Sequence, residues 1–297
     1  MAYEKINSVT NANMAKVSSV AKASLGKLVS VAAPIGDTAP VTDGLIGYWR
    51  GGEGVTTDTS GGTTTVSQWD NIASAKGGVA DQTWHMTQST KADQPTYNSG
   101  AGLLNWAGGS DIQNLVFDQT KVNYNVNYTV IILTDISAIG FGVHLGGSSV
   151  QGYLRTSSSL NAPYYRHGGI VLWRPPYSTA DSDLVNNANF DLIGWSWAAN
   201  PSNASGLGFI TGQHLFRENQ DADPSNASYF SSPSNKPLYM LGGYGGQSGS
   251  VIAQDIKEVM IFNKQLNQTE TTAIYNYCNE LVTLDGPPAN LNYYGTP

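Results

Sequence analysis

The chain of 297 residues has one cysteine and few charged side chains, and both shortages limit what it can be. Cys278 has no second cysteine to pair with, so an intramolecular disulfide is excluded and we expect assembly in a reducing cytoplasm. Charged residues make up 12% of the chain, and the net charge is −7. Nucleic-acid binding needs a basic face for the phosphates, so this balance argues against nucleic-acid partners and against attraction to anionic membranes.

Long apolar runs are missing as well. No stretch reaches the roughly 18 apolar residues of a membrane-spanning helix, and we expect no secretory signal because the N-terminus lacks an apolar segment. The chain is rich instead in aromatic residues and glycine, with 16 Tyr, 7 Trp and 33 Gly. Aromatic and β-branched residues fit pleated strands, whereas Gly and Asn supply turns, so the composition predicts short strands joined by many turns.

The first 33 residues carry a lysine-marked repeat of 11 residues. An 11-residue period suits a helix with one apolar stripe, whereas the β-branched residues suit short strands and turns, and a disordered tail is a third alternative. An ordered segment of this size has no core of its own, so we expect it to act as an anchor on a partner. The anchor positions are Lys5, Ile6, Val9, Lys16, Val17, Val20, Lys27, Leu28 and Val31.

The rest of the chain divides by composition and pattern. Residues 34–42 hold two prolines and a glycine and are predicted to be a linker. One helix is predicted after Asn267, which stands three residues before Glu270 in the spacing of a capping box. We therefore expect a β-sandwich over residues 43–284 and an irregular tail over 285–297. Short strands are predicted at 45–49, 115–117, 128–133, 190–197, 206–211, 238–243 and 256–262.

Both ends of the predicted sandwich resemble a known family. Residues 43–49, Asp-Gly-Leu-Ile-Gly-Tyr-Trp, are similar to the opening strand of concanavalin A-like, laminin-G-type jelly-roll domains, and residues 252–266 are similar to their closing strand. This resemblance implies an all-β jelly-roll sandwich with one short C-terminal helix, preceded by an N-terminal anchoring segment. The lysine repeat resembles segments that open structural proteins of tailed bacteriophages, which implies attachment to a virion.

Patterns that carry catalysis or bind metals are scarce. Glucanases of this fold place carboxylates at alternate positions of one strand, and Asp255 and Glu258, three apart, would lie on opposite faces. We therefore predict that the chain is not an enzyme, that Glu258 is structural and that no cofactor is needed. Calcium is the one metal for which the early loops offer oxygen ligands, and the weak candidates are Asp58, Asp70 and Asp81.

Two predicted loops combine aromatic rings with arginine. Sugars stack on such rings and accept hydrogen bonds from arginine, so these loops are candidates for glycan binding. The alternative is that the rings pack inside the sandwich or at a subunit interface. The candidates are Tyr164, Tyr165, Arg166, Trp173, Arg174 and Tyr177. Four other tryptophans are predicted to lie in the core or on a sheet face, namely Trp49, Trp69, Trp195 and Trp197.

The interpretation we prefer is a non-enzymatic virion accessory protein, either a capsid decoration protein or a short fibre. Residues 1–33 would bind other virion proteins, and the lectin-like domain would project toward host surface glycans. We expect a virion location after assembly in the host cytoplasm, and a homo-oligomer, for which trimers are common among projecting viral proteins. Two alternatives remain: a carbohydrate-binding receptor adhesin of a phage tail or fibre, and a glycan-active enzyme using Glu53, Glu258 or another carboxylate.

Overall fold

A computed structural model describes most of the predicted sandwich. The chain divides into two compact units, Met1–Gly36 and Asp37–Pro297. The predicted anchor and the C-terminal tail lie outside the described residues. The described ranges are 38–79, 84–107, 113–117, 128–138, 142–146, 153–157, 162–167, 170–173, 190–197, 206–210, 240–242 and 253–284.

Strands dominate the described ranges, and one α-helix, α3 (Gln268–Leu281), follows them. The strands of the first half are β1 (Leu45–Arg50), β2 (Val55–Asp58), β3 (Thr65–Trp69), β4 (Met86–Thr87), β5 (Thr96–Asn98), β6 (Leu103–Trp106), β7 (Asn114–Val116) and β8 (Tyr128–Ala138). Those of the second half are β9 (Gly142–Gly146), β10 (Tyr153–Ser157), β11 (Ala162–His167), β12 (Ile170–Trp173), β13 (Asp191–Trp197), β14 (Gly206–Ile210), β15 (Met240–Gly242) and β16 (Ala253–Phe262). Three 3-10 turns are η1 (Ser60–Gly62), η2 (Ser74–Lys76) and η3 (Lys91–Asp93).

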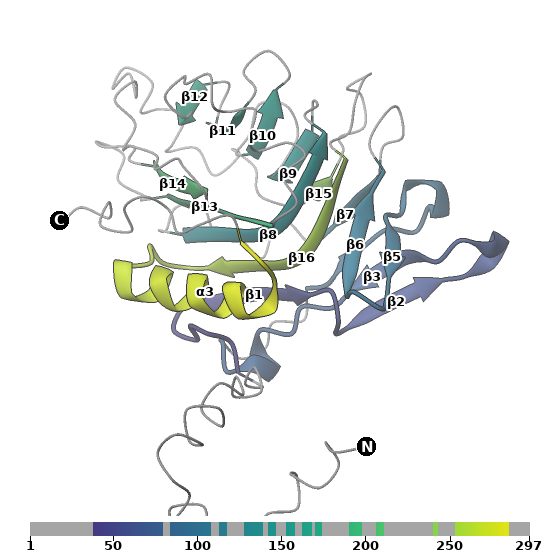
Figure 1. The fold of residues 1–297 in the computed structure, drawn as a ribbon, viewed down its shortest axis with the longest axis horizontal. Helices are drawn as coiled ribbons and strands as arrows, with labels where there is room; N and C mark the ends of the chain where they lie inside the picture. Colours follow the sequence, from purple (N-terminus) through teal and green to yellow (C-terminus); the bar gives the residue numbers. More distant parts are fainter. Residues whose placement is uncertain are drawn as a thin grey trace, which may run out of the picture. The chain divides into compact units, whose positions relative to one another are not determined.

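Antiparallel hydrogen bonds join the strands into one strongly curled sheet. Its order is β12-β11-β10-β9-β15-β7-β4-β3-β5-β6-β16-β8-β13-β14, with β1 paired to β16 and β2 to β3. Figure 1 shows β8 and β16 bending from one layer into the other. Register shifts between Ala253 and Gln254 and between Ile256 and Glu258 mark bulges, which bend strands in this way. The predicted all-β sandwich with one short C-terminal helix is confirmed.

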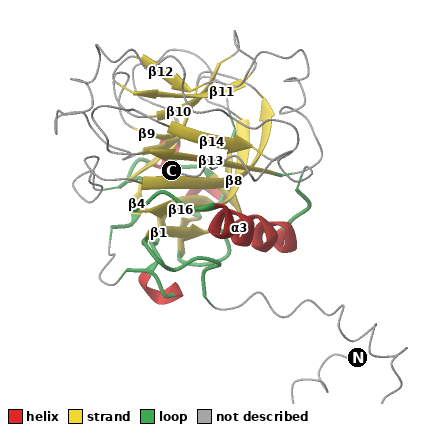
Figure 2. Ribbon diagram, turned by 90° about the vertical axis from the view of Figure 1, so that its left-hand side faces the viewer, coloured by secondary structure: helices red, strands yellow, loops and turns green. Residues whose placement is uncertain are grey.

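The helix covers the outer face of β1 and β16, beside which it lies in Figures 1 and 2. Asn267 caps it by accepting from the Glu270 backbone N–H, and the Glu270 side chain accepts from the Asn267 backbone N–H, which confirms the predicted capping box. Ile274 and Cys278, four positions apart, are both fully buried. Because the sandwich core covers the other face, β16 is buried at every position from Glu258 to Phe262.

Aromatic side chains fill the space on the core side of β1. The ring of Trp49 packs edge-on against Trp84 at 5.1 Å and stacks on Phe117 at 5.8 Å between centroids. Trp49 and Trp69 are fully buried, as predicted, whereas the side chains of Trp195 and Trp197 lie outside those described. Ala39 and Val41, which the sequence assigned to the linker, are buried in the same core. No described helix is long and apolar enough to cross a bilayer.

Candidate functional site

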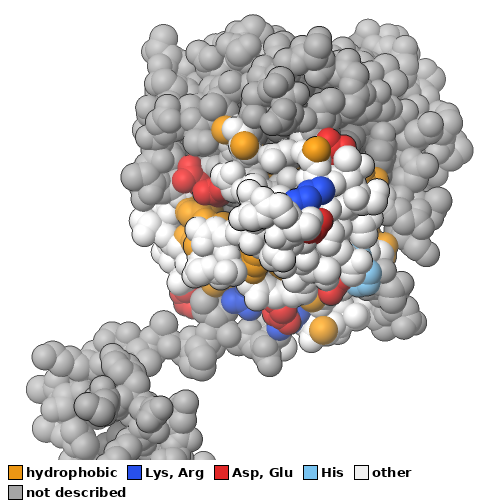
Figure 3. Space-filling view, turned by 90° about the vertical axis from the view of Figure 1, so that its right-hand side faces the viewer, with side chains coloured by type: hydrophobic (Ala, Val, Ile, Leu, Met, Phe, Trp, Pro, Cys, Tyr) orange, Lys and Arg blue, Asp and Glu red, His pale blue; other side chains and the backbone are white. Residues whose placement is uncertain are grey.

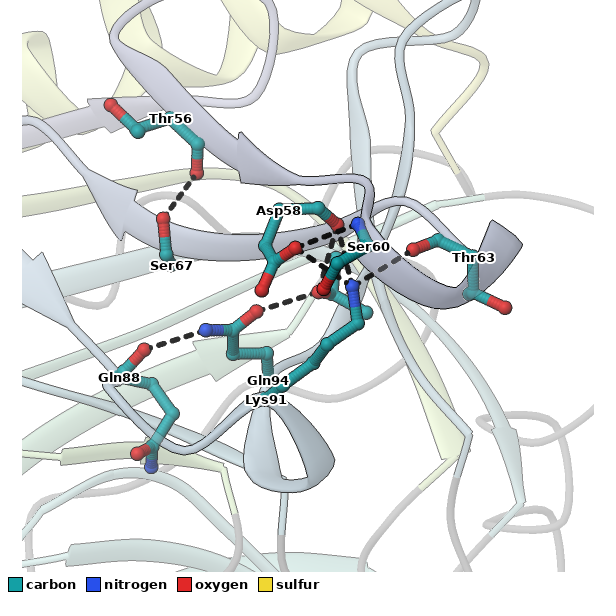
Figure 4. Close-up of polar contacts among 9 residues, drawn as sticks. Thr56, Asp58, Ser60, Thr63, Ser67, Gln88, Lys91 and Gln94 are labelled. Atoms are coloured by element: carbon teal, nitrogen blue, oxygen red, sulfur yellow. Dashed lines mark hydrogen bonds and ion pairs between the residues drawn. The ribbon is translucent and has the colours of Figure 1, made fainter.

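The β2–β3 hairpin forms the rim of the candidate site, and its turn is built by short-range polar contacts. Gly61 and Gly62 take the left-handed backbone that the tight turn needs, with φ of 77° and 86°. The Asp58 carboxylate accepts from the Ser60 backbone N–H at 2.8 Å and from Lys91 Nζ at 2.9 Å (Figure 4). The Ser60 hydrogen bonds and Lys91 lower the pKa of Asp58 to about 2. The ionised carboxylate therefore stabilises the turn.

An open groove of about 500 Å³ lies beside this hairpin, on strands β2, β3, β4 and β7. A volume of this size is typical of small-molecule sites. Its lining combines hydroxyl and amide side chains with one aliphatic residue. The lining residues are Thr56, Ser67, Gln68, Thr87, Gln88, Ser89 and Val116. Every polar group among them is neutral, so the groove presents hydrogen-bond donors and acceptors without charge.

Hydrogen bonds to the framework hold three of these side chains in place. Ser67 Oγ donates to the Thr56 carbonyl at 3.2 Å, and Gln88 Nε2 donates to Asn114 Oδ1 at 2.6 Å. The Gln88 backbone carbonyl in turn accepts from Gln94 Nε2 at 2.8 Å (Figure 4). Gln68 Nε2 donates to Asp70 Oδ1 at 2.7 Å. A site fixed in this way loses less conformational entropy when a ligand binds.

The groove retains hydrogen-bonding groups for a ligand. Within the described ranges no hydrogen bond engages the hydroxyl of Thr56, the hydroxyl of Ser89 or the amide oxygen of Gln68. Thr56 and Ser89 are exposed and Gln68 is half-buried. The described side chains on the face drawn in Figure 3 are mostly neutral, with a few charged ones among them. The groove can therefore exchange bound water for ligand hydroxyls without disturbing an ion pair.

A second polar cluster surrounds Glu258, beneath α3. Arg50 on β1 stands opposite Glu258 on β16, and Tyr48, two residues before Arg50, shares its face of the strand. Glu258 Oε1 lies 3.2 Å from Arg50 Nε and 3.0 Å from the Tyr277 hydroxyl, and Oε2 lies 3.0 Å from the Tyr48 hydroxyl. Glu258 is 1% exposed. The cluster therefore joins β1, β16 and α3 at one buried carboxylate.

The protonated form of the Glu258 carboxyl group fits the hydrogen bonds around it. The two tyrosine hydroxyls also lie 2.7 Å apart, so three oxygen contacts share two tyrosine protons when Glu258 is ionised. A protonated Glu258 supplies the third proton and completes the ring. Burial raises the pKa of Glu258 to about 7, against the opposing effects of Arg50 and the two tyrosines. Burial also raises the pKa of both tyrosines and of the Cys278 thiol.

The predicted glycan residues lie on strands, not in the loops that we expected. Tyr164, Tyr165 and Arg166 belong to β11, and Trp173 ends β12. Tyr165 and Trp173 are cross-strand partners in the backbone register. Their side chains, like Arg174 and Tyr177 as a whole, lie outside what is described. The expected loops are therefore corrected to a strand pair, and the role in glycan binding stays a prediction.

The candidate calcium ligands do not meet. Asp58 ends β2 and Asp70 follows β3, and in the antiparallel hairpin Asp58 is paired with Thr65, whereas Val55 is paired with Trp69. The two aspartates therefore lie at opposite ends of the hairpin, and Asp81 is outside the described residues. No group of three or more His, Cys, Asp or Glu side chains suited to a metal occurs within the described ranges. Calcium binding stays a prediction.

Comparisons with known proteins agree with the fold. No family model matches the chain, and no curated protein matches it. The sialidase of Trypanosoma rangeli in complex with sialic acid superposes with a TM-score of 0.53 and 13% identity, over 90% of this chain and 38% of that one. A mutant of the same sialidase displaying trans-sialidase activity superposes with a TM-score of 0.51 and 12% identity, over 90% of this chain and 38% of that one. A structure of botulinum neurotoxin type C, whose cell entry depends on interaction with two ganglioside molecules, has a TM-score of 0.43 and 12% identity, over 79% of this chain and 51% of that one.

Likeness at these identities establishes the fold alone. The chain belongs to the class of all-β sandwiches, and it spans 38% of the length of the sialidases that it matches. The comparisons support the sandwich part of the family resemblance seen in the sequence. They do not bear on the bacteriophage resemblance of residues 1–33, which stays a prediction.

One prediction from the sequence is contradicted. We predicted that the chain is not an enzyme because it lacks the alternating carboxylates of glucanases. The first structural neighbours are sialidases, which are glycan-active enzymes. Sialidases are an exception to the two-carboxylate scheme because their nucleophile is a tyrosine, so a missing carboxylate pattern does not exclude a glycan-active enzyme.

Proposed function

We propose that the β-sandwich is a carbohydrate-binding domain and that the groove on β2, β3, β4 and β7 is its glycan site. The observation that supports this most strongly is the groove's lining, which includes six hydroxyl or amide side chains, four of them on strands β2, β3 and β4. Sugar hydroxyls both donate and accept hydrogen bonds, and Thr, Ser, Gln and backbone groups do the same. Sites on strands hold such groups in place more accurately than sites on loops.

The test is binding of the full chain to an array of immobilised glycans, compared with two variants. Gln68→Ala removes an amide from the groove, and Gln265→Ala removes an amide outside the groove. Losing one neutral hydrogen bond costs about 1 kcal/mol, so Gln68→Ala should weaken binding roughly fivefold. Gln265→Ala should leave it unchanged. Equal binding by both variants would place the glycan elsewhere, and no binding by the unmodified chain would overturn the proposal.

A second candidate function is glycan hydrolysis, and the contact between Tyr277 and Glu258 favours it. A carboxylate can accept the proton of a tyrosine, and tyrosine is the nucleophile of sialidases. Burial raises the pKa of Tyr277, which opposes this chemistry and makes hydrolysis the second choice. The test is release of free sugar from sialyllactose and from neutral oligosaccharides. Turnover that Tyr277→Phe abolishes would support hydrolysis, whereas no turnover by the unmodified chain would overturn it.

For residues 1–33 we propose attachment to other virion proteins, supported by the lysine repeat alone. The sandwich would then be displayed on the particle, where it meets host glycans. The test is co-purification with virions of the full chain and of a chain that starts at Asp43. Retention of the full chain alone supports an anchor. Equal retention of both, or of neither, overturns it.

A further inference from the structure

We infer that the groove selects uncharged glycans and disfavours acidic ones such as sialylated sugars. This inference rests on the proposed function, because it concerns which glycans the same site accepts. It departs from what the structural neighbours alone would suggest, since one of them is bound to sialic acid.

A bound anion needs a cation or several convergent N–H donors to replace its hydration. The seven lining residues include no Lys, Arg or His. The nearby cation Lys91 is engaged by Asp58 at 2.9 Å and by the Asp58 and Thr63 carbonyls at 3.0 and 3.4 Å. Recruiting Lys91 to a ligand would break the contacts that hold the hairpin turn (Figure 4). The groove therefore has no cation ready for a carboxylate.

The charges beside the groove oppose an anion. One amide N–H of Gln68 donates to Asp70, so a neighbouring carboxylate takes up a donor that a ligand would need. Asp70 is half-buried, where charges are screened less than at a fully exposed position. The net charge of −7 adds a long-range repulsion for acidic glycans. A neutral sugar meets none of these costs and can use the same hydroxyl and amide groups.

The experiment compares matched pairs of glycans that share a core, such as lactose and sialyllactose, on one array probed with the full chain. Two variants introduce the same charge at adjacent positions. Thr56→Lys places a cation in the groove lining, and Thr57→Lys places one at the next residue, which does not line it. Both threonines are exposed strand residues, so neither change disturbs the core.

We expect the unmodified chain to bind neutral glycans more tightly than their sialylated partners. An exposed ion pair contributes up to about 1 kcal/mol, so Thr56→Lys should improve binding of the sialylated partner by up to roughly fivefold. That gain should disappear at high salt, and Thr57→Lys should not produce it. Tighter binding of sialylated partners by the unmodified chain overturns the inference and leaves the proposed function standing. No binding to any glycan overturns both.

Discussion

The groove and the Glu258 cluster are both polar, but their polar groups face different surroundings. The groove turns hydroxyls and amides toward solvent, where water satisfies them until a ligand arrives. In the cluster, a carboxyl group that is 1% exposed is satisfied by Arg50 and two tyrosines. Buried polar groups must pair with each other, whereas exposed ones need not. The groove should therefore tolerate substitution without unfolding, and the cluster should not.

The largest expected effect is the loss of the buried carboxyl group. Glu258→Ala leaves the Arg50 guanidinium and two tyrosine hydroxyls without their partner under α3. Removing one member of a buried charged pair costs about 3–5 kcal/mol of unfolding free energy. Urea denaturation followed by tryptophan fluorescence measures this loss. Gln68→Ala in the groove is the control and should change the same free energy by less than about 0.5 kcal/mol. Similar losses of unfolding free energy in the two variants would contradict the difference between the groove and the Glu258 cluster.

The pH dependence of stability should come from the cluster. Burial raises the pKa of Glu258 from 4.5 to about 7, so the folded state binds a proton that the unfolded state releases. The contribution of Glu258 to stability is then fully present below pH 4.5 and is lost as the pH rises through about 7, by roughly 3 kcal/mol in total. Denaturation at a series of pH values measures the slope. Glu258→Gln should remove it, and an unchanged slope in that variant would assign the titration to another group.

A smaller effect is expected where α3 meets the cluster. Tyr277→Phe keeps the ring but removes the hydroxyl that reaches Glu258 and Tyr48. Losing this hydrogen bond should cost about 1 kcal/mol, which corresponds to roughly fivefold more frequent opening of the helix. Cys278, the only cysteine and fully buried in α3, reports that opening through its reaction with a thiol reagent. Tyr275→Phe, on the same helix, is the matched control. Faster labelling in the control alone would contradict the role of Tyr277.

The smallest effect on stability is expected in the groove. Thr56→Ala removes an exposed hydroxyl for which the described residues provide no hydrogen-bond partner, so the unfolding free energy should shift by less than about 0.5 kcal/mol. Glycan affinity should fall up to roughly tenfold because a ligand hydrogen bond is lost. Isothermal titration with a glycan that binds the unmodified chain measures the affinity of Thr56→Ala and of the control Thr57→Ala. Urea denaturation measures the stability of both variants. A stability loss as large as the binding loss would make Thr56 a structural residue.

Local features of the fold could be read from the sequence. The Asn267–Glu270 capping box and the strands that begin at Leu45 and Tyr128 depend on neighbouring residues, and each was predicted. The contacts around Glu258 could not be derived because Tyr48 and Glu258 are 210 positions apart, and their meeting depends on strand register.

The groove was missed for a different reason. Its lining comes from four short strands and from the two residues after β4, and its Thr, Ser and Gln residues are also typical of turns. The one signal was in residues 65–69, where two half-buried polar residues, Ser67 and Gln68, stand between buried Val66 and Trp69. The loops predicted for Tyr164 and Trp173 were wrong, because these residues lie on β11 and β12; Pro163 stands near the start of β11, where proline is tolerated.

The measurement that tests the central claim most directly is hydrogen exchange of the full chain, with and without a neutral glycan chosen from the array. The account predicts slower exchange of backbone amides in residues 55–58, 65–69 and 86–89, which carry the groove. The amides of α3 should not change, because α3 contributes no residue to the groove. Protection confined to residues 162–173 would contradict the groove as the glycan site and return it to the strand pair of Tyr165 and Trp173.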